Sequence, residues 1–300
     1  MHKNMVAILL FIVVSLTWGT TWLAMQIAVK SISPVLATGL RFLCAAPVLL
    51  CIAGITKMPL LFPPGERVFQ CMVVLFYFSL PFTLMIYGEQ FVSSALAAII
   101  FATMPAAVLV ASVILLRQRT NLLQLTGLLM ALLSLCGILL FESNGDVEGH
   151  TEGVIALMLA VVMHAIIYTQ CKKRCSTLSV ITFNALPCLF AGLLLSVAGI
   201  MLENDSIDGF SPASLGAVMY LGIVAGVCGI LSYFALQKKA GVFQASLVFL
   251  VFPIIAICLE SGINGYMISL HSIYLFFPLG IGLLLVLLFP ATIPYKTPKK

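Results

Sequence analysis

The feature that most limits what this chain can fold into is a series of apolar stretches of similar length. The hydrocarbon core of a bilayer is about 30 Å thick and a helix rises about 1.5 Å per residue, so about 20 apolar residues span it. Ten stretches reach this length, and each predicts a membrane helix. Their predicted ranges are Met5 to Ala28, Pro34 to Ile55, Arg67 to Gly88, Phe91 to Leu115, Leu122 to Phe141, Gly153 to Cys171, Thr177 to Met201, Pro212 to Leu236, Val242 to Glu260 and Ile268 to Phe289.

Composition indicates that lipid is the solvent of these helices. Hydrophobic residues make up 62% of the chain and charged residues 8%, whereas soluble domains hold about 45–50% and about 25%. The first stretch is too long for a signal peptide and ends without a small-residue cleavage site, so we count it as a membrane helix. The sequence therefore predicts an all-α integral membrane protein.

The basic residues predict the orientation in the membrane. Ten spans return both termini to one side, and every Lys and Arg except Lys30 and Arg41 falls on that side. The positive-inside rule then places both termini in the cytoplasm of a multi-pass protein of a bacterial inner membrane. No basic face with interleaved aromatic residues is present, so the net charge of +5 indicates contact with the lipid bilayer and not with nucleic acid.

An internal repeat divides the chain into halves. The pattern Ala97-x3-Phe101-x3-Pro105 returns 148 residues later as Ala245-x3-Phe249-x3-Pro253. We expect one five-helix repeat over 1–145, a second over 150–290, and a cytoplasmic tail over 291–300. An odd number of spans per half inverts the second repeat, and inverted halves are typical of secondary transporters with a solute site near the midplane.

The chain resembles the drug/metabolite transporter superfamily, and within it the EamA-domain carriers. The residues that carry the resemblance are Trp18-Gly-Thr-Thr21-Trp22, Pro34 followed by Arg41-Phe42, Gly88-Glu89-Gln90 leading to Ser94-Ala-Leu-Ala97, Tyr220-Leu-Gly222 with Ser232-Tyr233, and Gln244-Ala-Ser-Leu247 running to Pro253. The resemblance implies ten helices in two inverted repeats around a central cavity. It also implies export of amino acids, metabolites or toxic compounds.

This sequence departs from the family pattern at three places. Members usually carry a glutamate 13 residues after each mid-helix proline, where this chain has Gln118 and Tyr266. Members also tend to have a tryptophan where His164 stands. These departures do not change the expected fold. They mean that the substrate of a relative is not evidence for the substrate of this chain.

Candidate solute-binding residues follow from the repeat and from polarity inside the membrane. At an offset of 146 residues, Trp18 corresponds to His164 and Trp22 to Tyr168. Charged and polar side chains near the midplane usually face a cavity or a partner, although packing, snorkelling and helix-to-helix hydrogen bonds are alternatives for each. The predicted solute site comprises Trp18, Thr21, Trp22, Gln26, Arg41, Phe101, Pro105, His164, Tyr168, Phe249 and Pro253.

Three titratable residues are candidates for gating or coupling: Glu89, His164 and Glu260. The two glutamates are also consistent with pairing to Arg41 or with an interfacial position. His164 titrates near physiological pH when unperturbed, and a neutral, hydrogen-bonded ring is the alternative.

The sequence therefore predicts a secondary or facilitative transporter of a small organic solute that exports by alternating access. We predict no catalytic residue, metal or cofactor, since no phosphate-binding loop or nucleophile elbow is present and the C-x3-C pair of Cys171 and Cys175 falls short of the four ligands of a zinc site. A membrane enzyme acting on lipid-linked groups is the alternative, and a second copy of the chain is a candidate partner.

Overall fold

The computed structural model describes residues 2–117, 119–142, 147–174, 177–203, 209–240, 245, 247–265 and 267–288. Within them, eight helices are long and apolar enough to cross a membrane, and shorter apolar helices cover Leu122–Ile138 and Val248–Ile263. This confirms the prediction of an all-helical membrane protein with ten helices. The predicted tail 291–300 and the family positions Gln118, Gln244, Ser246 and Tyr266 lie outside the described residues.

The first repeat is built from helices that begin where serine or proline allows it. Ser93 lies just before α5 and its Oγ accepts from the N–H of Leu96 at 3.2 Å, which is why this helix begins at Ser94 and not near the predicted Phe91. Pro105 splits the fourth predicted span at Thr103. The elements are α1 (His2–Ala28), α2 (Pro34–Thr56), α3 (Arg67–Val73), η1 (Val74–Ser79), α4 (Leu80–Gly88), α5 (Ser94–Ala102), α6 (Met104–Leu116) and α7 (Leu122–Glu142).

The second repeat follows the same general order of helices. Its first helix begins at Val147, earlier than the predicted Gly153, because a helix satisfies its own backbone and can extend past the apolar stretch. Pro253 lies inside α13 without splitting it, unlike Pro105. The elements are α8 (Val147–Arg174), α9 (Val180–Leu202), α10 (Pro212–Met219), η3 (Tyr220–Gly229), α11 (Ile230–Ala240), α13 (Val248–Asn264) and α14 (Leu270–Leu288).

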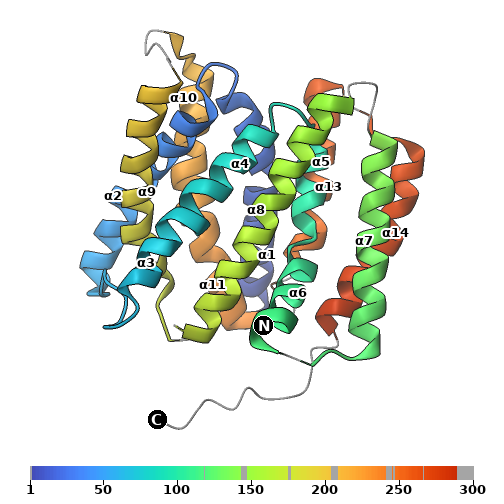
Figure 1. The fold of residues 1–300 in the computed structure, drawn as a ribbon, viewed down its shortest axis with the longest axis horizontal. Helices are drawn as coiled ribbons and strands as arrows, with labels where there is room; N and C mark the ends of the chain where they lie inside the picture. Colours follow the sequence, from blue (N-terminus) through green and yellow to red (C-terminus); the bar gives the residue numbers. More distant parts are fainter. Residues whose placement is uncertain are drawn as a thin grey trace.

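Helices of one repeat pack on helices of the other. At one edge of the bundle α2 lies beside α9, and at the opposite edge α7 lies beside α14 (Figure 1). Glycines set both distances: a Cβ on Gly39 would lie 2.5 Å from the backbone N of Ser196 in α9, and one on Gly127 would lie 2.6 Å from the carbonyl O of Gly282 in α14. Small residues at such contacts are typical of membrane helices, since they let backbones approach closely.

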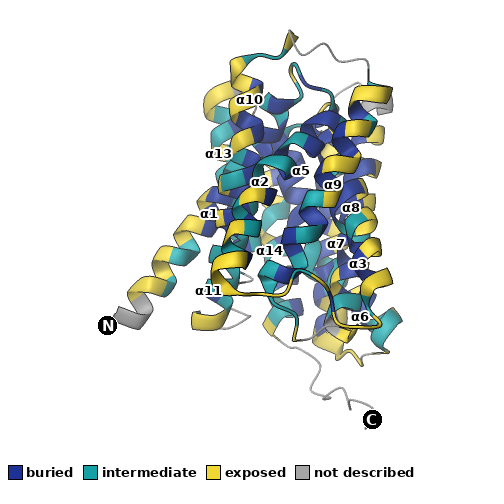
Figure 2. Cartoon of the chain, turned by 90° about the vertical axis from the view of Figure 1, so that its left-hand side faces the viewer, coloured by how far each residue is buried: buried dark blue, intermediate teal, exposed yellow. Residues whose placement is uncertain are grey.

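The surface of the bundle is apolar and its interior holds the polar groups. Exposed residues lie along the outer faces of the helices, and buried residues lie between them (Figure 2). The exposed set includes large side chains such as Leu133, Ile200 and Phe277. Such a surface would associate in water and suits a lipid environment.

Candidate functional site

A cavity of about 210 Å³ lies between the two repeats. Residues of α1, α2 and α5 line it from the first half, and residues of α8, η3 and α13 line it from the second. The structure brings together seven residues of the predicted solute site there: Trp18, Thr21, Trp22, Arg41, Phe101, His164 and Phe249.

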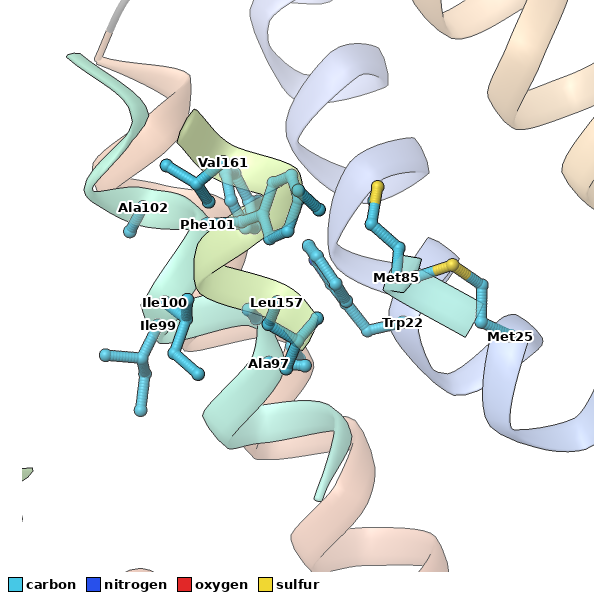
Figure 3. Close-up of a cluster of buried hydrophobic side chains, with 14 of the residues drawn as sticks. Trp22, Met25, Met85, Ala97, Ile99, Ile100, Phe101, Ala102, Leu157 and Val161 are labelled. Atoms are coloured by element: carbon cyan, nitrogen blue, oxygen red, sulfur yellow. The ribbon is translucent and has the colours of Figure 1, made fainter. Parts of the chain in front are cut away.

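Aromatic rings form one wall of the cavity. The ring of Trp22 points from α1 toward Phe101 of α5, with centroids 4.9 Å apart and planes at 54° (Figure 3). Phe252 of α13 stacks with Trp22, with ring centroids 6.4 Å apart. Trp18, one turn earlier on α1, contacts Tyr233 at 4.8 Å and Phe249 at 5.8 Å. Helices of both halves therefore meet at the α1 tryptophans.

His164 reaches the cavity from α8 inside a cage of aromatic rings. Its Nδ1 lies 3.0 Å from the carbonyl O of Ala160, one turn earlier in the same helix. Since a carbonyl only accepts, Nδ1 carries the hydrogen. The ring centroids of Tyr77 and Phe82 lie 4.8 and 5.0 Å from the centroid of the imidazole. Both ring planes are nearly perpendicular to the imidazole plane. The bond to Ala160 lies within α8, and a backbone contact with Tyr77 also connects the ring to η1 of the first repeat.

Arg41 is the charged group of this cavity. Its side chain is 3% exposed, and its guanidinium lies 5.0 Å from the ring centroid of Phe82. Nη2 donates to the carbonyl O of Leu221 at 3.5 Å, and Nη1 faces the Sδ of Met25 at 3.8 Å. Both contacts are long for hydrogen bonds, so the guanidinium is weakly engaged by the protein.

Two π-helical segments supply cavity residues that the sequence analysis missed. They are η1 in the third span and η3 in the eighth, and they occupy corresponding places in the two repeats. The first contributes Tyr77 and Phe78, and the second contributes Leu221, Gly222 and Ala225. A π-helix disturbs the regular backbone ladder and is frequent at functional sites. Sequence periodicity does not reveal one, although the small residues of η3 are a signal of close packing.

Four residues of the predicted solute site lie outside the cavity lining: Gln26, Pro105, Tyr168 and Pro253. Tyr168 is one turn beyond His164 on α8 and is 43% exposed, so its expected correspondence with Trp22 does not bring it to the same cavity. Pro105 and Pro253 act on the backbone of their helices, as the break at Thr103 shows for the first. The remaining lining includes Asn184, Cys188, Met85 and Met104.

The buried glutamates meet at the start of α5 and not at Arg41. The N–H of Ala95 donates to Oε2 of Glu260 at 2.6 Å, and Ser94 Oγ donates to Oε2 of Glu89 at 3.0 Å. Oε1 of Glu89 is buried without a hydrogen-bond partner. Both side chains are buried in the protein, and both lie at a helix N-terminus, where negative charge is stabilised.

A third carboxylate repeats this arrangement on α2. The N–H groups of Val35 and Leu36 each donate to one oxygen of Glu203 at 2.9 Å. Glu203 follows α9 and Glu260 belongs to α13, so these two carboxylates of the second repeat each bind the first turn of a helix of the first repeat. These bonds connect the halves at one end of the bundle.

Burial raises the pKa of the Glu89 carboxyl well above its usual range; the Ser94 hydrogen bond opposes this and the charge of Glu260 adds to it. Glu89 follows α4 in the loop before α5. Because its folded pKa exceeds the unfolded value of about 4.3, the folded protein binds more protons above that pH, and stability falls as pH rises toward the folded pKa. Glu89→Gln should remove this part of the decline.

Thermal unfolding of the detergent-solubilised protein between pH 5 and 8 measures this effect. Glu66→Gln is the matched control, since Glu66 is a partly exposed acid paired with Arg174 at 3.5 Å. Parallel pH dependence in the wild type and Glu89→Gln would contradict the prediction.

Comparison with known proteins identifies relatives over nearly the whole chain. The model of the EamA-like transporter family matches residues 5–140 and 151–288. Protein PagO of Salmonella typhimurium is 59% identical over 287 residues, which cover 96% of this chain and 94% of that protein. An uncharacterized transporter of Buchnera aphidicola subsp. Schizaphis graminum is 48% identical over 288 residues, covering 96% of each chain.

A more distant relative and a solved structure agree with these matches. The uncharacterized inner membrane transporter YedA of Escherichia coli K12 is 27% identical over 256 residues, which cover 84% of this chain and 81% of that protein. A crystal structure superposes with a TM-score of 0.67 at 18% identity and covers 95% of this chain and 97% of that chain. At that identity the likeness shows a shared fold.

Proposed function

Because the chain belongs to the EamA-like transporter family, we propose that it is a secondary carrier that exports a small organic solute across a bacterial inner membrane by alternating access. The central cavity is the solute site. The observation that carries the proposal is that both repeats line this one cavity, with Trp22 and Phe101 from the first half and His164 and Phe249 from the second.

Alternating access follows from a site held between inverted halves. When two such repeats exchange conformations, the cavity between them faces one side of the membrane and then the other. The solute contacts both halves, so its movement is tied to their rearrangement. Aromatic walls stack on a flat or apolar solute and need little ordering on binding.

Glu89 and Glu260 form the gate of this carrier in our proposal. The bond from Ala95 to Glu260 joins α5 of the first repeat to α13 of the second, so opening at that end must break it. The bonds from Val35 and Leu36 to Glu203 join α2 to the end of α9 in the same way. Charge-assisted hydrogen bonds of this kind hold a closed state more strongly than neutral ones.

A growth assay combined with reconstituted transport tests the function. Cells that overproduce the chain are grown with a panel of toxic aromatic acids, amines and amino acid analogues, and solutes that give resistance are then assayed in proteoliposomes. We expect resistance to at least one class and saturable transport of its members. Trp22→Ala should lose both at equal membrane abundance. Resistance and transport that are identical in Trp22→Ala would contradict the cavity as the solute site.

We also propose that both termini are cytoplasmic, on the ground of the basic residues. Glu142 to Glu152 and Glu203 to Asp208 would then face the periplasm. A periplasmic phosphatase fused after Asn144 should be active, and the same enzyme fused after Lys300 should be inactive. The reverse pair of activities would invert the topology.

A further inference from the structure

Arg41 is a buried cation that no acidic side chain neutralises in the described part of the protein. Of the described residues that line the cavity, none is Asp or Glu. The one ion pair found among described residues is between Arg174 and Glu66, which lies outside this lining. The buried acids Glu89 and Glu260 are engaged at the start of α5.

The contacts of Arg41 with the described residues engage few of the N–H donors of its guanidinium. Arg carries five N–H donors in a planar fork. The structure gives it one long bond to the Leu221 carbonyl and one contact with the Met25 sulfur. The rings of Phe82 and Phe42, at 5.0 and 5.7 Å, offer cation–π attraction but no hydrogen-bond acceptor.

A buried cation with so few hydrogen bonds is unfavourable unless an anion pairs with it. Taking a cation out of water costs several kcal/mol after relaxation, and a well-placed opposite charge with hydrogen bonds offsets that cost. A carboxylate fits the Arg fork with two parallel bonds. Arg41 lines the cavity that the solute would occupy.

We propose that the solute is an organic monocarboxylate whose carboxylate binds Arg41 and whose apolar or aromatic body packs against Trp18, Trp22 and Phe101. This inference rests on the proposed function, since it assigns the chemical class of solute for the same cavity. An ammonium group finds no acidic side chain among the described lining residues, so neutral and cationic analogues of the same shape bind less well.

Tryptophan fluorescence reports directly on this cavity. The chain has two tryptophans, and both Trp18 and Trp22 line it. Nitrophenylacetate, nitrophenylacetamide and nitrophenethylamine share one quenching ring and differ in the charge of the attached group. Each is titrated into the purified full-length protein in detergent, and the saturable part of the quenching gives a dissociation constant.

The expected result is that the carboxylate binds at least about tenfold more tightly than the amide or the amine. Arg41→Gln should bring the carboxylate to the affinity of the amide, and Arg41→Lys should keep part of the preference because it keeps the charge without the fork. Arg174→Gln, which removes an arginine that is not part of this lining, should leave the preference unchanged.

Two results overturn the inference while leaving the proposed function in place. One is wild-type protein that binds the amide or the amine as tightly as the carboxylate, which needs no variant and so does not depend on Arg41→Gln folding. The other is a carboxylate preference that survives in folded Arg41→Gln. Absence of saturable quenching by all three probes would instead reject the cavity as the solute site, and with it the proposed function.

Discussion

Replacing Trp22 by alanine is expected to weaken solute binding and transport more than replacing any aromatic residue on the lipid-facing surface. Trp22 is 4% exposed and its ring contacts Phe101 of the first repeat and Phe252 of the second. Aromatic contacts are worth about 0.5–1.5 kcal/mol beyond burial, so the lost stacking alone weakens a bound aromatic solute by about twofold to tenfold. The lost burial adds to this.

The same substitution should lower the stability of the protein. Truncating a buried tryptophan to alanine removes about 3–5 kcal/mol in a closely packed core, and the cavity beside Trp22 places this site toward the lower end. Trp22→Phe should retain most of both properties, since a ring still contacts Phe101.

Quenching of the remaining Trp18 by nitrophenylacetate, together with thermal unfolding, measures both effects of Trp22→Ala. Phe277→Ala is the matched control, because Phe277 is 69% exposed on α14 and is not part of the cavity lining. Equal losses in the two variants would mean that Trp22 acts only through general packing.

The fold was predictable because the membrane requires a regular pattern. An apolar stretch of about 20 residues specifies a spanning helix without reference to tertiary structure. The corrections lie at helix ends, where local chemistry decides: Ser93 starts α5 later than the apolar pattern predicts, and α8 begins earlier because a helix can continue into water. Neither effect depends on hydropathy.

Less of the candidate site than of the fold was predictable from the sequence. Trp18 and His164 were found because the repeat pairs them, and both line the cavity. The same pairing does not bring Tyr168 to the cavity lining, where this residue is 43% exposed on α8. Tyr77 and Gly222 were not predicted as cavity residues because they lie in π-helical segments. A π-helix shifts the helical register, and the pattern of apolar residues does not show such a shift.

Glu260 illustrates why a buried charge is hard to assign from sequence. Its position near a helix end fits an interfacial residue, a partner for Arg41 or a gate equally well. In the tertiary structure the carboxylate accepts from the first turn of α5, and Arg41 lies beside the cavity instead. When a carboxylate of one repeat binds the N-terminus of a helix in the other repeat, no sequence pattern indicates the contact.

Replacing Gly222 by alanine is expected to disturb the Arg41 region although it adds one methyl group and no charge. A Cβ at Gly222 would clash with the backbone carbonyl O of Arg41 and lie 2.8 Å from the Cβ of Cys44 in α2. Backbone atoms of a packed helix cannot rotate away, so α2 and η3 must separate. Overpacking of this kind costs about 1–3 kcal/mol.

The consequence for binding follows from where the clash lies. Arg41 donates to the Leu221 carbonyl, the residue before Gly222, so separating α2 from η3 moves the guanidinium away from its support and out of register with the cavity. We expect Gly222→Ala to unfold at lower temperature and to lose most of the nitrophenylacetate preference over the amide.

Gly216→Ala is the matched control: Gly216 lies on α10 in the same span, and a Cβ there meets nothing within 4 Å. That substitution should be neutral or stabilise the helix by up to about 1 kcal/mol. Gly222→Ala protein that unfolds and binds like Gly216→Ala would show that the α2 to η3 distance does not set the position of Arg41.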